Sequence, residues 1–280
     1  MIIIKIKGGL GNQIFQYAFG RYLSLKTGRK LKLDLSYFKS NSYRKFNLDK
    51  FNIVFDGVID FKSKILLKSS IYFPRIFKNN FCIINNNTQY FDPSVIQRIV
   101  SNKKCFLNGY WQSESFFSEI DDFLKKELNL KKEYFNNLNK TVLRKILNTN
   151  SVAIHVRRGD YIWENLNKPY NVCDLKYYAS AIKIVKDKIK NPFCFIFSDD
   201  IEWVKKNLII ELPKVYVTEN SVYKDFALMS FCKHNIMANS TFSWWASRLN
   251  SNLNKIVVAP HAWRTDGVRE ELHTDYQIRI

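Results

Sequence analysis

Short apolar runs alternate with helix-length segments along this chain, and this alternation limits the possible folds more than any other feature. In the second half, the runs typical of strands cover residues 152–155, 193–198, 215–217, 234–238 and, as the last strand, 255–259. The segments with helical character cover residues 175–190, 201–208, 222–233 and 239–249. Strands that are joined through helices form parallel sheets, and ligands bind at the carboxyl ends of such strands. We therefore expect a parallel sheet with a nucleotide-sized crevice at that edge.

The first forty residues contain the same pattern once more. A β-branched run at residues 2–6 predicts a strand, an amphipathic segment at 14–27 predicts a helix that ends at Gly28, and residues 30–34 predict a second strand. The turn between them, Gly-Gly-Leu-Gly-Asn-Gln at residues 8–13, lacks the G-x-G-x-x-G spacing of dinucleotide-binding turns. Its glycines still expose backbone N–H groups at a helix start, where an anion or a sugar hydroxyl can bind.

The middle of the chain, residues 40–150, is less regular and has aromatic strands or loops near residues 46–54 and 81–84. Because the strand and helix alternation recurs on both sides of this segment, we expect two docked α/β domains, residues 1–150 and 151–280. The 280 residues are 46% hydrophobic, which is enough for a large core. Nine glycines and six prolines leave no room for a long flexible linker.

Aromatic residues gather after a predicted strand end at residues 108–113, where a helix with Phe116 and Phe117 is expected to follow. Tyr110 and Trp111 can stack against the face of a sugar ring. Such pairs more often belong to a core or an interface, and we favour that interpretation.

Cysteine content and the amino terminus indicate the compartment. The five cysteines are widely spaced, lie in apolar runs and show no C-x-x-C pair, so we expect reduced thiols and neither a disulfide framework nor a zinc site. The apolar run at residues 2–6 is too short for a signal peptide or a membrane span. These features predict a cytoplasmic protein.

The formal net charge of +19 comes from lysines scattered along the chain. A positive field of this size attracts polyanions or anionic lipid. No helix-turn-helix, zinc-finger or RNA-recognition signature accompanies it, so nucleic-acid binding is not favoured. Solvated lysine-rich faces are the simplest interpretation, and peripheral contact with the anionic inner face of the cytoplasmic membrane is the second.

A charged heptapeptide, His-Val-Arg-Arg-Gly-Asp-Tyr at residues 155–161, follows the apolar run at 152–154. Planar guanidinium groups are suited to bidentate contact with the phosphates of a nucleotide. In the alternative interpretation, Arg157 or Arg158 pairs with Asp160 in an ordinary surface loop. The heptapeptide alone leaves both possibilities open.

Two further polar motifs lie at predicted strand ends. Ser-Asp-Asp at residues 198–200 ends one strand, and Asn-Ser-Thr-Phe-Ser-Trp-Trp at 239–245 begins a helix directly after another. Hydroxyl and backbone N–H groups at a helix start are good phosphate ligands. Ordinary helix capping, by Asn239 or Ser240 and by Asp199, is the alternative.

The glycine-rich turn and these three motifs occur in the order found in one known family. The chain resembles bacterial α-1,2-fucosyltransferases of glycosyltransferase family 11, which use GDP-β-L-fucose as donor, and the resemblance spans nearly the whole sequence. It departs from the family pattern at Ala-Ser-Arg, residues 246–248, where relatives have Gly-Ala, and beyond Trp263. The resemblance implies an α/β fold of the GT-B type, with two Rossmann-like domains facing each other across a cleft. Residues 1–150 would form the acceptor-side domain and residues 151–280 the GDP-fucose-binding domain.

The resemblance also implies roles for individual residues. Arg157 would bind the β-phosphate and carry the charge of the leaving group, His155 would lie by the guanosine, and Asp225 would accept hydrogen bonds from the guanine ring. Ser240, Thr241 and Phe242 would hold the diphosphate through hydroxyl and backbone donors. The remaining positions of the implied donor site are Arg158 and Asn239, together with Gly11 and Asn12 from the first domain.

A β-linked donor that yields an α-fucoside reacts with inversion, in one displacement helped by a carboxylate base. Asp160 is the first candidate for this base, with Glu164 second, and orienting an arginine is the alternative role of Asp160. The sequence contains no D-x-D, so we expect no metal or other cofactor and arginine in its place. The implied acceptor is the 2-hydroxyl of a galactoside in a lipid-linked surface polysaccharide. A fucosyltransferase of another linkage, a non-catalytic carbohydrate-binding protein and a nucleic-acid-binding protein are the alternatives.

Overall fold

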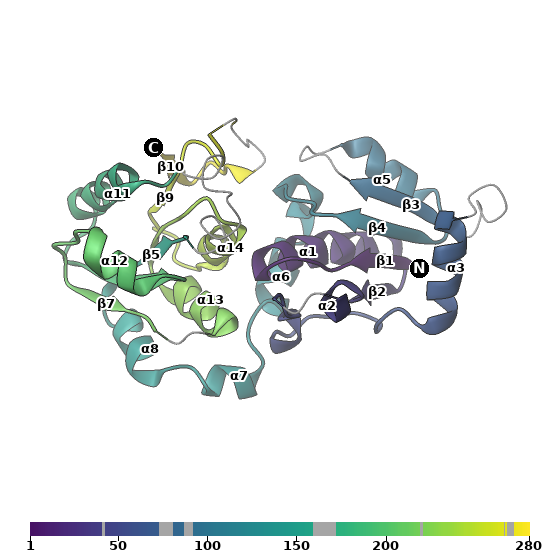
Figure 1. Cartoon of the computed structure of the whole chain (residues 1–280), viewed down its shortest axis with the longest axis horizontal. Coiled ribbons are helices and arrows are strands. Elements are labelled where there is room, and N and C mark those ends of the chain that lie inside the picture. The colour runs from purple at the N-terminus through teal and green to yellow at the C-terminus, as the bar shows by residue number, and fades with distance from the viewer. Residues whose placement is uncertain are drawn as a thin grey trace. The chain divides into compact units, whose positions relative to one another are not determined.

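The computed structural model describes residues 1–40, 43–72, 81–86, 92–158, 172–218, 221–265, 267 and 272–280. The chain divides into two compact units, Met1–Asn129 and Leu130–Ile280, and both are built on a parallel β-sheet with helices (Figure 1). The division lies at residue 129 rather than at the expected 150. The reason is that α8 (Lys140–Leu147) packs against α13 (Val222–Phe231) and β5 (Asn150–Val156) of the second unit.

Unit 1 contains a four-stranded sheet in the order β2-β1-β4-β3, and all of its pairs are parallel. Its strands are β1 (Ile2–Lys5), β2 (Leu31–Asp34), β3 (Cys82–Asn86) and β4 (Cys105–Gly109). Its helices are α1 (Leu10–Thr27), α2 (Tyr37–Ser40), α3 (Phe61–Tyr72), α5 (Pro93–Val100) and α6 (Asp121–Glu127), with 3₁₀ turns η1 (Leu48–Lys50), η2 (Glu114–Phe116) and η3 (Ser118–Ile120). The predicted first strand–helix–strand unit is confirmed. The helix expected after residue 113 is instead a pair of 3₁₀ turns.

Helices cover both faces of the unit 1 sheet. Successive side chains of a strand point to opposite faces, so apolar residues of β1 pack against helices on each side. On one face α1 packs closely at Gly20, where a Cβ atom would lie 2.9 Å from Leu31 Cδ1 and 3.1 Å from Ile4 Cγ2. On the other face Ile3 joins a buried cluster with Leu67 of α3. The core of unit 1 therefore has two layers, one on each side of β1.

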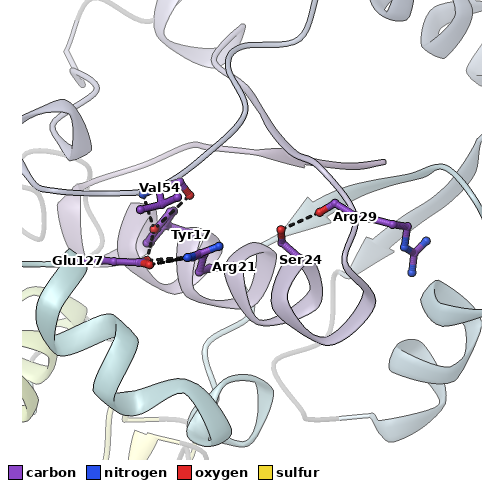
Figure 2. Close-up of polar contacts among 6 residues, drawn as sticks. All are labelled: Tyr17, Arg21, Ser24, Arg29, Val54 and Glu127. Atoms are coloured by element: carbon purple, nitrogen blue, oxygen red, sulfur yellow. Dashed lines mark hydrogen bonds and ion pairs between the residues drawn. The ribbon is translucent and has the colours of Figure 1, made fainter.

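A buried polar cluster fastens α1 to the end of α6 (Figure 2). The hydroxyl of Tyr17 donates to a carboxylate oxygen of Glu127 and accepts a 2.8 Å hydrogen bond from the backbone N–H of Val54. Arg21 pairs with the same carboxylate through Nε and Nη2, at 2.9 and 2.7 Å. Each buried polar group in this cluster thus has a partner, which is what burial of a charge requires.

Unit 2 contains a six-stranded sheet in the order β10-β9-β8-β5-β6-β7, again parallel at every pair among the described residues. Besides β5, its strands are β6 (Pro192–Ser198), β7 (Lys214–Tyr216), β8 (His234–Ile236), β9 (Val257–Ala259) and β10 (Gln277–Arg279). Besides α8 and α13, its helices are α7 (Lys132–Asn136), α11 (Leu175–Lys188), α12 (Ile201–Asn207) and α14 (Thr241–Leu249). Counted along the chain, the strand order is 3-2-1-4-5-6, the Rossmann order.

The strands and helices predicted for the second half are present within a few residues of the expected bounds. The prediction that residues 255–259 form the last strand is wrong, since β10 adds to the sheet beside β9. The predicted parallel arrangement is confirmed. Within the described ranges, no helix is both long enough and apolar enough to span a bilayer.

Candidate functional site

The carboxyl ends of β5 and β8 form the topological switch point of unit 2. These two strands are neighbours in the sheet, and in this strand order the connections that leave them run to opposite sides. A crevice forms between such strands outside their carboxyl ends. Arg157 follows β5 directly, and Ser240 lies between the end of β8 and α14. Motifs that are far apart in the sequence therefore meet at one edge of the sheet.

His155 occupies the centre of this edge. Its side chain is only 5% exposed, and its ring centroid lies 5.5 Å from that of Phe242 in α14. Its Nδ1 atom is buried and has no hydrogen-bond partner among the described residues. Burial, together with the nearby charge of Arg157, lowers the pKa of His155 to about 3, so the imidazole is neutral at neutral pH. A buried nitrogen without a partner is rare in proteins and is a natural contact for a ligand.

Arg157 is held by a carboxylate from the neighbouring strand. Its Nη1 atom lies 2.9 Å from Oδ2 of Asp199, which follows β6. The other carboxylate oxygen of Asp199 accepts a 2.9 Å hydrogen bond from the backbone N–H of Arg158. Asp199 thus fastens both the Arg157 side chain and the start of the loop behind it. The side chain of Arg157 is about one-fifth exposed, so it is accessible at the sheet edge.

Arg158 points to a different environment. Its Nε atom lies 3.3 Å from Oδ2 of Asp200, and its guanidinium carbon lies 3.5 Å from the centroid of the Trp203 ring. Asp200 also caps α12 by accepting a hydrogen bond from the backbone N–H of Trp203 at 3.1 Å. Arg158 is therefore anchored on the start of α12, an arrangement in which cation–π and ionic contacts support each other.

Several expectations fall outside the described residues, among them both candidate bases, Asp160 and Glu164. The arginine partners that the structure does describe are Asp199 and Asp200. The sequence interpretation offered Asp199 as an alternative helix cap, which is wrong because Asp200 caps α12, and it missed the pairing of Asp199 with Arg157. The signal was its place at the end of β6, which lies beside β5 in the sheet.

The start of α14 presents partly exposed polar groups at the same edge. Ser240 caps the helix by accepting a 3.3 Å hydrogen bond from the backbone N–H of Phe242, and both Thr241 and Phe242 are partly exposed. The expected ordinary cap is therefore present, and it leaves the hydroxyl groups at the edge. Asn239 is buried and donates from Nδ2 to the carbonyl of Trp263 at 3.0 Å, which fixes the loop before the helix.

Asp225 lies in the first turn of α13, next to Phe226. The ring of Phe226 packs 5.4 Å from that of Phe242, which in turn contacts His155. A chain of rings therefore links α13, α14 and β5. The structure brings the neighbourhood of Asp225 to the edge that carries His155 and Arg157.

The glycine-rich turn of unit 1 follows β1, whose carboxyl end lies beside that of β4. Gly8 has a φ of 79°, a conformation that glycine adopts without strain. Gln13 is buried and donates to the carbonyl of Gly8 at 2.9 Å, so it organises the turn. Gly11 is buried in the first turn of α1, while Asn12 accepts a 2.6 Å hydrogen bond from Gln112.

Tyr110 and Trp111 have separate roles. Trp111 is 1% exposed and packs against Phe19 with ring centroids 4.6 Å apart, which confirms core packing for this residue. Tyr110 is 45% exposed, and the Lys7 amine lies 4.7 Å from its ring centroid. Lys7 also donates to Oδ1 of Asn108 at 3.0 Å. Only Tyr110 of this pair presents a ring that a sugar can reach.

A parallel sheet in the Rossmann order, with an arginine, a buried histidine and a helix start at its switch point, is typical of α/β proteins that bind nucleotides. Comparison with known families makes the assignment specific: glycosyl transferase family 11 matches residues 1–279, and the chain belongs to this family.

Three relatives illustrate what the chain is similar to. It is 32% identical to the O-antigen biosynthesis glycosyltransferase WbnK of Escherichia coli, over 98% of this chain and 99% of that protein. It is 33% identical to an alpha-1,2-colitosyltransferase of Escherichia coli, over 98% and 95% of the two chains. Galactoside alpha-(1,2)-fucosyltransferase 1 of Saimiri sciureus is 28% identical over 51% of this chain and 42% of its own length.

Solved fucosyltransferases share the fold. The NodZ alpha-1,6-fucosyltransferase soaked with GDP-fucose matches with a TM-score of 0.56 and 15% identity, over 89% of this chain and 92% of that chain. A mutant of Arabidopsis thaliana FUT1 in complex with GDP matches with a TM-score of 0.55 and 12% identity, over 92% and 70%. At these identities the likeness concerns the fold.

Proposed function

We propose that this protein transfers L-fucose from GDP-β-L-fucose, with inversion, to the 2-hydroxyl of a galactoside in an O-antigen-like surface polysaccharide. The observation that carries the proposal is the buried, neutral His155 beside Arg157 at the switch point of unit 2, with the His155 Nδ1 atom unsatisfied among the described residues. Two relatives whose names include O-antigen biosynthesis or an alpha-(1,2) fucosyl linkage support the acceptor class and the bond formed.

In the proposed donor complex, each residue has a task that its chemistry suits. Arg157 contacts the diphosphate, because a guanidinium keeps its positive charge and its planar donors match phosphate oxygens. His155 contacts the nucleoside as a neutral imidazole that donates from one nitrogen and accepts at the other. Ser240, Thr241 and the backbone N–H groups at the start of α14 bind phosphate oxygens.

The proposed reaction is a single displacement at C1 of the fucose. The bond from C1 to the β-phosphate oxygen breaks while the acceptor oxygen bonds to C1 from the opposite face, and GDP leaves with the electron pair. Arg157 stabilises the negative charge that develops on the departing diphosphate. A carboxylate, Asp160 first and Glu164 second, takes the proton of the acceptor hydroxyl. We also propose that the transfer needs no metal ion, with arginine supplying the positive charge.

In this proposal, unit 1 binds the acceptor sugar. The exposed ring of Tyr110 offers a flat surface for the apolar face of a sugar, and Lys7 and Asn12 are polar groups that follow the carboxyl end of β1 in the same sheet. The facing arrangement of the two units across a cleft, implied by the resemblance, stays a prediction.

A second candidate donor is the corresponding colitose nucleotide, favoured by the similarity to an alpha-1,2-colitosyltransferase. Colitose is fucose without its 3-hydroxyl, so the two donors differ by one hydrogen-bonding group. A site that binds this hydroxyl discriminates strongly against the analogue that lacks it. Measuring kcat/KM for both donors with the same acceptor distinguishes the two functions.

The direct test is transfer from GDP-fucose to a panel of β-galactosides, with linkage analysis of the product. The proposal expects an α-1,2-linked fucoside, formed equally well with and without a metal chelator. A product of another linkage would contradict the acceptor assignment. Complete inhibition by the chelator that added Mg²⁺ or Mn²⁺ reverses would contradict the metal-independent mechanism.

A further inference from the structure

Helix α3 of unit 1 presents large apolar side chains to solvent. Phe61 is 79% exposed, Ile65 is 49% exposed and Tyr72 is 74% exposed. They occupy positions i, i+4 and i+11, which form one stripe along a helix. The opposite side of α3 supplies buried Leu67 and Ser70 to the unit. The helix therefore has exposed apolar side chains on its outer side in addition to its packed inner side.

The charge of α3 is entirely positive. Its sequence, Phe-Lys-Ser-Lys-Ile-Leu-Leu-Lys-Ser-Ser-Ile-Tyr, contains three lysines and no acidic residue. At 100° per residue, Lys68 falls within the stripe, between Ile65 and Tyr72, and Lys62 and Lys64 fall on its two sides. The preceding acidic residue, Asp60, is already engaged: it accepts from Lys32 Nζ at 2.5 Å and from the Ser63 backbone N–H at 2.8 Å.

We propose that the outer side of α3, formed by Phe61, Ile65 and Tyr72 together with the three lysines of the helix, docks on an anionic phospholipid bilayer. Apolar side chains of such a helix enter the boundary between headgroups and acyl chains, while lysine amines extend to lipid phosphates. A second copy of the chain is a poor partner for this surface, since the same helix would set lysines against lysines. The charge of the whole chain, +19, adds attraction at longer range.

None of these residues is among those assigned to the donor site, so the inference goes beyond the proposed function and does not depend on it. If the acceptor is carried on a membrane lipid, docking through α3 also holds unit 1 at the surface where the acceptor is found. The orientation expected is with α3 parallel to the bilayer plane.

Co-sedimentation with lipid vesicles tests the proposal on the full chain. The wild type is expected to bind vesicles containing phosphatidylglycerol, to bind neutral phosphatidylcholine vesicles far more weakly, and to dissociate as salt is raised. Replacing Lys62, Lys64 and Lys68 together with Gln should weaken binding on the order of a hundredfold, since each lysine near an anionic surface contributes roughly fivefold.

The matched control removes the same charge from another helix. Lys176, Lys183 and Lys188 of α11 are exposed. Their replacement by Gln should lower the affinity for vesicles by no more than about threefold, because it changes only the long-range attraction. A Phe61→Ser, Tyr72→Ser double variant should also bind weakly, because the apolar anchor is lost. Circular dichroism and thermal melting establish that each variant is folded.

The inference would be overturned by no binding of the wild type to anionic vesicles, by equal weakening in the α3 and α11 lysine variants, or by unchanged binding of the folded Phe61→Ser, Tyr72→Ser variant. Binding of the wild type to neutral and anionic vesicles alike would also contradict it, because the argument requires anionic lipid.

Discussion

The two adjacent arginines after β5 are held by different partners. Arg157 pairs with Asp199 and lies close to His155, whereas Arg158 pairs with Asp200 and stacks on Trp203. A guanidinium is rigid and planar, so the partner that fixes one edge also sets the direction of the remaining donors. These contacts favour Arg157 for the diphosphate and give Arg158 an additional structural task.

Replacing Arg157 with Ala should lower kcat by about 10²–10³-fold, the usual effect of removing one donor that stabilises charge in a transition state. Turnover is measured by the release of GDP from GDP-fucose. Arg98→Ala in α5, which removes an exposed arginine of unit 1, is the matched control. Undiminished turnover of the Arg157→Ala protein would rule out the proposed donor site.

Asp199 is expected to act through Arg157. Asp199→Asn keeps an acceptor for the backbone N–H of Arg158 but removes the charge that Arg157 pairs with. Charge-assisted hydrogen bonds contribute about 1.5–3 kcal/mol, so we expect kcat/KM to fall about 10- to 100-fold. Asp199→Ala, which removes both contacts, should lose more. The positioning role fails if Asp199→Asn changes the melting temperature and leaves kcat/KM as in the wild type.

The low pKa of His155 makes stability depend on pH. The folded pKa is about 3 and the unfolded pKa is about 6.5, so both states are neutral above pH 6.5 and only the unfolded state gains a proton as the pH falls between these values. The free energy of unfolding should therefore decrease in that window, by up to about 1.4 kcal/mol per pH unit from this group.

Urea denaturation at pH 7 and pH 5 measures this dependence, and a His155→Gln variant should show a smaller difference between the two pH values. His234, whose pKa burial also lowers, contributes in the same direction but is present in both proteins. Equal pH dependence in the two proteins would show that His155 is not buried in its neutral form.

At the scale of elements, local patterns explain most of what the sequence predicted. β5 and β6 are continuous apolar runs, so their bounds are found within a few residues. β10 was missed because Gln-Ile-Arg at its place has no strand pattern, and its existence depends on pairing with β9. In place of the helix expected after residue 113, the chain forms 3₁₀ turns, and the ring of Phe116 packs against those of Trp111 and Phe19.

Comparing two helix-cap variants distinguishes an effect on stability from an effect on ligand binding. Ser240 caps α14 at the candidate site, and Asp92 caps α5 in unit 1 by accepting from the backbone N–H of Ser94 at 2.9 Å. Replacing either residue with Ala should reduce the free energy of unfolding by about 0.5–2 kcal/mol. Only Ser240→Ala should also weaken GDP binding, as measured by calorimetry. Equal GDP affinity of the two variants would argue against a phosphate contact at Ser240.

At the scale of the whole molecule, strand order decides where a ligand can bind. The order in unit 2 places the ends of β5 and β8 side by side, and the order in unit 1 does the same for β1 and β4. Both sheet edges carry motifs that the sequence singled out: the start of the charged heptapeptide and of α14 in unit 2, and the glycine-rich turn in unit 1.

GDP should stabilise the folded chain, because a ligand that binds only the folded state shifts the unfolding equilibrium. At 100 times its Kd, the gain in the free energy of unfolding is about 2.7 kcal/mol. Thermal denaturation with GDP, UDP, free fucose and a short DNA duplex makes the comparison, and stabilisation by GDP alone is the expected result. Stabilisation by DNA without any by GDP would favour the nucleic-acid-binding alternative.

The sequence by itself determined the parallel α/β class, the family and the positions of the motifs, because apolar periodicity and short motifs are local properties of a chain. Only the tertiary structure decided that β5 lies beside β8, that Asp199 at the end of β6 pairs with Arg157, and that His155 is buried against Phe242. These facts depend on contacts between residues far apart in the sequence. Strand order and side-chain burial set such contacts, and no short segment of the sequence determines either of them.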